Sequence, residues 1–351
     1  MEGRASNRRS MKLADGTELP KVEVFKTPMP FPPQHINAYL IRAEEPILVD
    51  TGVKLPEAWT FLESGLRTFG LSIKDIKHLF ITHAHVDHYG QAKKIRDASG
   101  CKVYANVKEK PQLEREHWRK STVDSPYMQF FREWGVPEQL ILTNLQGQKM
   151  SDSLLEPVQV DVGLEDGRPI EVAGVQIRPV WVPGHAIGHT VYIVDEWQCM
   201  FSADHLLPDI SPVPLLNFPD RDKKLKTRSL VEWLDSLTKI EPERVRVALP
   251  SHGEPILDHR SLIAGYRLHT ERRRLKVEKH LRESGPLTAY EVSRKMFGDA
   301  RAQTLMYLTM SEAVGHLELL EDRGQILIED RAGVHYYRLR PETPAETEPA
   351  A

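Results

Sequence analysis

Three histidines and one aspartate lie within six residues, directly after a short apolar run, in Ile81-Thr82-His83-Ala84-His85-Val86-Asp87-His88. Residues 76–82 are apolar and rich in strand-forming side chains, so we expect a buried strand that ends at this motif. In an extended chain His83 and His85 project to the same side. These two imidazoles are therefore expected to share one cation, while Asp87 and His88, at the following turn, face a second cation beside it.

Three further segments place a histidine or an aspartate just past a strand-like run. His185 follows the run 175–181 after a Pro-Gly turn, Asp204 ends the run 200–203, and His252 ends the run 245–249. Strand ends meet at one edge of a sheet, so donors from distant parts of the chain are expected to gather there. A donor set of imidazoles and carboxylates suits Zn²⁺ and tolerates Fe or Mn. The absence of cysteine from this donor set argues against a purely structural zinc site.

These motifs and their order resemble those of the metallo-β-lactamase-fold hydrolases, over about residues 20 to 260. H-x-H-x-D-H is matched at 83–88, P-G-H-x-x-G-H-T at 183–190, S-H-G at 251–253 and V-D-T-G at 49–52. The one departure is Ala203, where glycine usually precedes the bridging aspartate. The resemblance implies one metal ion held by His83, His85 and His185, a second held by Asp87, His88 and His252, and Asp204 bridging both.

Two Zn²⁺ ions at such a site can share a hydroxide, because coordination lowers the pKa of water from about 15.7 toward ~7. Asp87 is then expected to orient this hydroxide or to take its proton. His189, four residues after His185, is either a hydrogen-bonding neighbour of the ligands or a packed structural histidine. Asp50 is expected to bond a ligand histidine or the backbone, and His205 to point away from the metals.

Composition places the chain among ordinary globular proteins. It has 351 residues, a formal net charge of −3 and two cysteines, Cys101 and Cys199, which favour a reducing compartment. Neither an apolar secretory segment nor a membrane-length apolar run is found, so we expect a cytoplasmic protein with no membrane partner. Residues 1–19 are expected to form a flexible tail, and residues 341–351 a disordered one.

Strand and helix signals alternate along residues 20–260, which indicates an α/β catalytic domain. Together with the resemblance they predict an αββα sandwich. Residues 108–147 read as a helical insertion that carries aromatic side chains. We favour a lid over the site for it, and the alternative is that these aromatic residues belong to an ordinary core. These aromatic residues are Trp118, Tyr127, Phe130, Phe131 and Trp134.

The remaining residues, 261–340, read as a linker helix and a small winged-helix-like domain, a pattern also found behind some metallo-β-lactamase-fold hydrolases. From residue 285 to residue 340 there are eight acidic against seven basic side chains. The helix expected to read DNA carries Glu312, Glu318, Glu321 and Asp322, which would repel phosphates. We therefore expect no DNA binding and favour packing or homodimerisation for this module.

The sequence thus predicts a dinuclear metal-dependent hydrolase that acts on a small thioester or ester, as the resemblance to glyoxalase II-type and acyl-thioester hydrolases implies. The alternative is an endoribonuclease, since β-lactamase-like endoribonucleases carry a similar tail and two metals suit a phosphodiester equally well. A basic groove beside the site would favour RNA, and the candidate residues for it are Lys108, Lys110, Arg115, Arg119 and Lys120. A metabolite-binding DNA regulator is the functional hypothesis that the sequence favours least.

Overall fold

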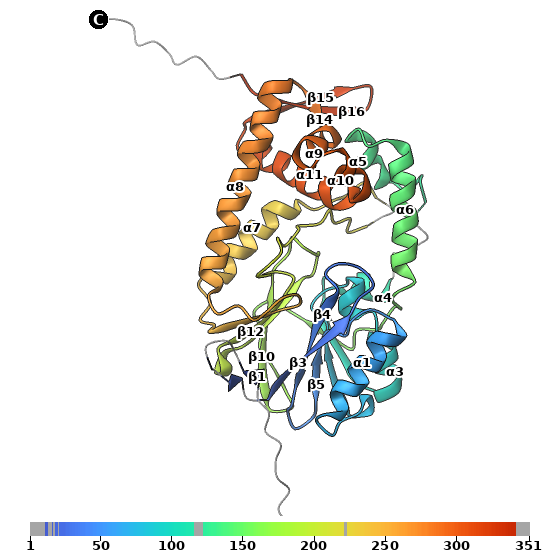
Figure 1. Ribbon diagram of the computed structural model, residues 1–351, viewed down its shortest axis with the longest axis vertical. Coiled ribbons are helices and arrows are strands. Elements are labelled where there is room, and N and C mark those ends of the chain that lie inside the picture. Colours follow the sequence, from blue (N-terminus) through green and yellow to red (C-terminus); the bar gives the residue numbers. More distant parts are fainter. Residues whose placement is uncertain are drawn as a thin grey trace, which may run out of the picture.

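The computed structural model describes residues 11–12, 16, 18–19, 21–115, 122–220 and 223–341. Two β-sheets face each other, with helices on both outer faces (Figure 1). The first sheet has the order β3 (Val22–Pro28), β4 (His35–Ile41), β5 (Ile47–Val49), β6 (His78–Phe80), β7 (Lys102–Asn106) and β8 (Val162–Leu164). The second has the order β13 (Val247–Pro250), β12 (Cys199–Ala203), β11 (Thr190–Val194), β10 (Val175–Trp181) and β9 (Ile170–Val172).

Apolar side chains on both faces of the strands explain this layering. Strands β5, β11 and β12 are buried along their whole length, which requires cover on both sides. Between the sheets, Phe80 stacks on Tyr104 with ring centroids 4.5 Å apart and meets Tyr192 edge-on. Helices α1 (Pro56–Arg67) and α3 (Ala92–Ser99) cover the outer face of the first sheet, while α7 (Ser229–Ile240) and α8 (His259–Ser284) cover the second. Helices therefore lie outside both sheets, as the sequence predicts.

The amino-terminal segment is partly ordered, which corrects one boundary. Strands β1 (Met11–Lys12) and β2 (Glu18–Leu19) pair antiparallel, and Leu19 is buried in the cluster between the two sheets. The predicted flexible tail over 1–19 is thus wrong at its carboxyl end, because an apolar side chain anchors that part of the chain. Residues 1–10, and residues 342–351 of the predicted carboxyl tail, lie outside the described residues.

The insertion contains α4 (Lys110–Glu114), α5 (Met128–Glu133) and α6 (Glu138–Asp152), so its last helix runs five residues past the predicted end at Gly147. Tyr127, Phe131 and Trp134 are buried in one hydrophobic cluster. These three side chains are therefore part of a hydrophobic core, as the alternative to a lid predicts, and a lid role of the insertion stays a prediction. Trp118 lies outside the described residues.

The carboxyl-terminal part contains β14 (Leu287–Thr288), α9 (Ala289–Phe297), α10 (Asp299–Thr304), α11 (Met306–Asp322), β15 (Ile326–Arg331) and β16 (Val334–Leu339). Its strands form a sheet of order β14-β16-β15. Side chains of this part and of the insertion share one cluster, in which Tyr127 and Phe131 join Val292, Met310 and Leu317. Hydrophobic packing therefore continues across the predicted domain boundary at residue 260.

Figure 1 shows how this arrangement is connected: α8 runs along one side of the molecule, and α6 lies on the other side. No helix among the described residues is both long and apolar enough to cross a lipid bilayer.

Candidate metal centre

Carboxyl ends of strands from both sheets supply the side chains of the site. His83 and His85 follow β6, and the short helix α2 (Val86–Tyr89) begins directly after His85. His185 lies in the turn between β10 and β11, Asp204 follows β12, and His252 follows β13. In that turn, Gly184 has a φ of +127°, and a Cβ there would lie 2.5 Å from the Cβ of Trp233, so only glycine fits.

One group of donors consists of His83, His85, His185 and Asp204. The Nε2 atoms of His83 and His185 each lie 2.9 Å from Nδ1 of His85, and Nε2 of His185 lies 3.1 Å from an Asp204 oxygen. Burial lowers the pKa of His83 well below its usual value and that of His85 to about 3, and neighbouring histidines add to the effect. These rings are therefore neutral, with lone pairs that converge on one point.

The second group consists of Asp87, His88 and His252. Nε2 of His252 lies 3.4 Å from Oδ2 of Asp87, and Nε2 of His88 lies 3.8 Å from the same oxygen. Asp204 joins the two groups, since Oδ2 faces His185 while Oδ1 lies 3.5 Å from His88 and 3.7 Å from His252. The side chains of the seven predicted ligands are thus brought together, and Asp204 lies between the two groups.

Hydrogen bonds on the far side of the rings fix which nitrogen faces the centre. Nδ1 of His185 donates to the Val213 carbonyl, and Nδ1 of His252 donates to the His35 carbonyl, both at 2.8 Å. Each bond leaves the Nε2 lone pair directed at the donor group. This pattern is typical of histidines that bind metals.

Asp50 performs the same task for His88. Its Oδ2 accepts from Nδ1 of His88 at 2.7 Å and from the Thr82 hydroxyl at 2.8 Å, and Oδ1 accepts from the Thr82 N–H. Asp50 has a φ of +58°, a left-handed conformation in which the backbone turns its carboxylate toward His88. The predicted contact between Asp50 and a ligand histidine is present.

Glu109 is a buried residue near the site that the sequence motifs do not reveal. Its Oε1 accepts from the N–H of Ala84 at 2.7 Å, and Oε2 accepts from the N–H of Gly188 at 2.5 Å. One carboxylate thus holds together the His83–His85 segment and the turn that carries His185. Burial raises the pKa of Glu109 to about 7, against the effect of these N–H donors. Only its position in the sequence could have indicated this role, because Glu109, like the ligands, comes shortly after a strand, β7.

The residues next to Asp204 also shape the centre. The Ser251 hydroxyl donates to Oδ1 of Asp204, which adds a role to the S-H-G motif. Ala203 has a φ of +46°, so it adopts the left-handed conformation that glycine reaches without steric cost. The unusual alanine is therefore accommodated with local strain.

His189 belongs to neither donor group. It is fully buried, its ring centroid lies 4.6 Å from that of His83, and neither ring nitrogen has a hydrogen-bond partner in the described part of the chain. His205 is buried in the same way, 6.2 Å from His189 between centroids. His78 bonds Tyr104 and Glu45, which makes it a structural histidine.

The chemistry of the donors fits two divalent cations. Five histidines contribute a ring nitrogen to the two donor groups, and Nε2 of His88 is buried with no hydrogen-bond partner among the described residues. Both cysteines are buried in hydrophobic clusters and take no part. Imidazole and carboxylate donors in two adjacent groups are suitable for a dinuclear metal site.

Comparison with known proteins agrees with this fold and this site. The model of the metallo-beta-lactamase superfamily matches residues 31–252, more than half of the chain, and the chain belongs to this superfamily. It is 27% identical over 313 residues to a probable metallo-hydrolase, YqjP, of Bacillus subtilis, which covers 86% of this chain and 92% of that protein.

Two further proteins are similar to the chain. An atrochrysone carboxyl ACP thioesterase of Aspergillus terreus is 24% identical, over 76% of this chain and 67% of its own length. The crystal structure of a metallo-beta-lactamase family protein, TTHA1429 of Thermus thermophilus, superposes with a TM-score of 0.78 at 28% identity, over 92% of this chain and 99% of that one. The superposed share is too large to be confined to residues 31–252, so the likeness extends beyond the region matched by the family model.

Proposed function

We propose that this protein is a dinuclear metal-dependent hydrolase of thioesters, with Zn²⁺ as its metal. His83, His85 and His185 would hold one ion, Asp87, His88 and His252 the other, and Asp204 both. Such a pair of ions supplies a hydroxide nucleophile at neutral pH and polarises the acyl oxygen. Asp87 belongs to the second group, where its carboxylate can also orient the attacking water and accept a proton.

The residues that line a recess beside the donor groups support a thioester as the substrate. Ala84 and Ala186, next to the ligand histidines, line a recess of about 70 Å³ together with Ile187, Phe218 and Tyr307. Glu109 is the charged residue of this lining, and both its oxygens already accept backbone N–H groups. Gln112 and Asn217 also line the recess, whose exposed lining is mostly polar. The lining contains no lysine or arginine that could pair with a phosphodiester, whereas an uncharged thioester needs no such partner.

Three of the five residues predicted to form a basic groove contact other side chains. Nζ of Lys108 lies 3.7 Å from the ring centroid of Trp181, and Arg115 pairs with Asp152 at 3.1 Å. Lys110 lies 3.7 Å from a Glu114 oxygen. Arg119 and Lys120 lie outside the described residues. These contacts favour the thioester over RNA, and the fungal relatives that are named ACP thioesterases support the same choice.

The test is a substrate panel with purified, metal-replete protein, which elemental analysis should show to carry close to two metal ions per chain. We expect the highest kcat/KM for an acyl thioester, compared with the matched oxygen ester, a β-lactam and single-stranded RNA. Asp204→Ala should reduce it by about 10³-fold or more with the fold intact by circular dichroism, whereas His189→Ala should keep both metals. RNA cleavage without thioester hydrolysis, or protein free of transition metal, would refute the proposal.

A further inference from the structure

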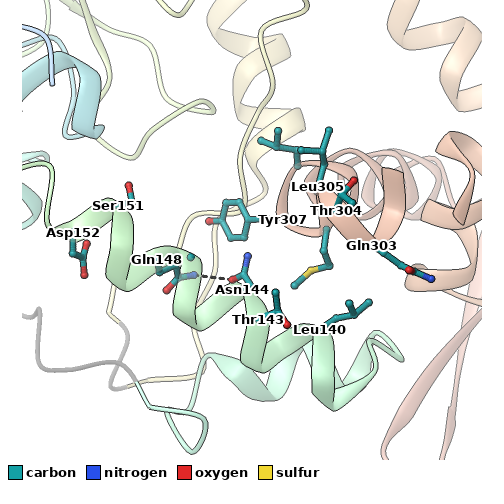
Figure 2. A pocket seen from close by; sticks show the side chains of 13 residues that line it. Leu140, Thr143, Asn144, Gln148, Ser151, Asp152, Gln303, Thr304, Leu305 and Tyr307 are labelled. Atoms are coloured by element: carbon teal, nitrogen blue, oxygen red, sulfur yellow. Dashed lines mark hydrogen bonds between the residues drawn. The ribbon is translucent and has the colours of Figure 1, made fainter. Parts of the chain in front are cut away.

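A groove between the insertion and the carboxyl-terminal module contains none of the proposed metal ligands. Helix α6 forms one wall, and α10 with the start of α11 forms the other (Figure 2). Its volume of about 510 Å³ lies within the range of about 300–1,000 Å³ that is usual for small-molecule sites.

The two walls differ in chemistry. Thr143, Asn144 and Gln148 of α6 present hydroxyl and amide groups, and Figure 2 shows Asn144 and Gln148 joined by a hydrogen bond, 3.0 Å long, on the side that faces Tyr307. The opposite wall includes Leu305 and Leu308, which are 48% and 40% exposed although they are large and apolar. A ligand that fits both walls needs neutral hydrogen-bonding groups along an otherwise apolar chain.

Tyr307 connects this groove with the metal centre. Its side chain lines the groove and also lines the recess beside Ala84 and Ala186. Its hydroxyl donates to the Leu216 carbonyl, which holds the ring at the junction. Tyr307 therefore borders both hollows, and a chain-like ligand in the groove would have to pass this side chain to present its end to the donor groups.

We propose that this groove binds the pantetheine arm of an acyl thioester and directs the thioester carbonyl to the metal centre. The proposal rests on the proposed function and names its substrate class. Pantetheine consists of amide groups, a hydroxyl and a dimethyl-substituted carbon in an uncharged chain that ends at sulfur. Its amides match the α6 wall, and its methyl groups match Leu305 and Leu308.

The charges of the lining residues also favour an uncharged ligand. Asp152 is the charged side chain among the lining residues, and it pairs with Arg115. The lining offers no lysine or arginine, so a nucleic acid strand would find no partner for its phosphates there. The phosphate that ends a pantetheine arm would stay at the exposed rim, where Gln303 and Thr304 lie.

Gly147 provides a direct test. It lies on α6 in the groove lining, and a Cβ added there meets no atom within 4 Å. Gly147→Phe should fill the groove without disturbing the helix, since phenylalanine has a better helix propensity than glycine. Gly265 of α8 is the matched control, because it is a helical glycine with open space around its Cβ and does not line the groove.

Each variant would be assayed with an acyl-pantetheine and with the same acyl group on N-acetylcysteamine, which is too short to fill the groove. We expect Gly147→Phe to raise KM for the acyl-pantetheine about tenfold and to change the short thioester less than about twofold. Gly265→Phe should change neither. Acyl-CoA and an acyl-loaded carrier protein, compared on the wild type, identify which carrier presents the arm.

The outcomes separate the two proposals. If the wild type hydrolyses both thioesters and Gly147→Phe leaves both KM values unchanged, or raises them equally, the groove assignment is overturned while the function stands. If the wild type hydrolyses no thioester, the function fails and the pantetheine assignment fails with it. Loss of RNA cleavage in Gly147→Phe would make the groove a nucleic acid path and would also overturn the assignment.

Discussion

At the scale of single residues, the centre depends on side chains that hold the ligand segments in place. Asp50 bonds His88, Ser251 bonds Asp204, and Glu109 joins the segments that carry His85 and His185. Such partners orient the ligands before a metal binds, so their loss should weaken metal binding although they touch no ion.

Glu109→Gln tests this role. Glutamine offers one acceptor oxygen where Glu109 uses two, so the N–H of Ala84 or that of Gly188 would face an NH₂ group. We expect metal affinity to fall by about 10- to 100-fold and the free energy of unfolding by about 1–3 kcal/mol. Competition with a chelator and urea denaturation measure the two effects. Glu156→Gln, at an exposed carboxylate 3.4 Å from Lys54, is the control and should change neither.

Ala203→Gly tests the strain at the bridging aspartate. Ala203 has a φ of +46°, and a left-handed alanine costs about 1–2 kcal/mol, part of which glycine loses again through its greater freedom in the unfolded chain. We expect the free energy of unfolding to rise by about 0.5–1 kcal/mol. Ala38→Gly, in the buried strand β4, should lower it instead. A destabilised Ala203→Gly protein would show that the turn carries no strain.

At the scale of secondary-structure elements, α11 is the helix whose role changes most when its surroundings are known. Residues 309–320 of this helix are buried throughout. The acidic side chains of α11 pair with basic side chains outside this helix: Glu318 with Lys226, Asp322 with Arg228, and Glu312 with Arg273 of α8. The acids that would repel phosphates therefore serve contacts within the protein.

Lys226→Met measures one of these contacts. It leaves the carboxylate of Glu318 buried without its lysine, which should lower the free energy of unfolding by about 2–3 kcal/mol. Adding Glu318→Gln should restore most of the loss, because the uncompensated charge is gone. Lys223→Met is the control, since Lys223 is 74% exposed beside Asp220 and should change stability by less than about 0.5 kcal/mol. Equal losses in the single and the double variant would contradict a charge effect.

Duplex DNA should bind weakly, because the buried α11 cannot enter a groove and its acids would meet phosphates. In fluorescence anisotropy at physiological salt we expect a Kd no tighter than about 10⁻⁶ M, which is the non-specific range. Sequence-selective binding at ~10⁻⁸ M or better would overturn the packing role that we propose for the module.

At the scale of the whole molecule, the insertion and the carboxyl-terminal module are packed as one body. Tyr127, Phe131 and Trp134 lie in the same hydrophobic cluster as Met310 and Tyr337. The module has helices followed by a hairpin, as the sequence predicts, with an additional short strand β14 before them, and its assignment as a winged helix stays a prediction. In the structure, α10 and α11 of the module form the second wall of the groove that α6 lines.

Truncation after Ser284 should therefore expose the aromatic cluster and cause self-association or loss of solubility, while the metals stay bound, because all proposed ligands lie at or before His252. Light scattering after gel filtration and elemental analysis measure the two properties. Removal of residues 342–351 alone is the control and should leave both unchanged. A truncated chain that stays monomeric and keeps its stability would show that the module is not part of the core.

The sequence by itself predicted the seven donor residues that the structure brings together, because their spacing along strand ends is a local property: alternation in the extended chain sets His83 and His85 on one side, and the turn after them presents Asp87 and His88. It also predicted, from apolar runs, the strands β6, β10, β12 and β13 that precede the donor residues, and a linker helix where α8 lies.

Only the tertiary structure decided the roles that depend on partners far apart in the chain. Glu109 became the link between two ligand segments because strand β7 ends beside both, and no short motif records that position. The aromatic residues of the insertion became core, and the acids of α11 became ion-pair partners, because the carboxyl-terminal module packs against them. Burial and pairing are properties of the neighbours that folding brings close, so a local pattern does not contain them.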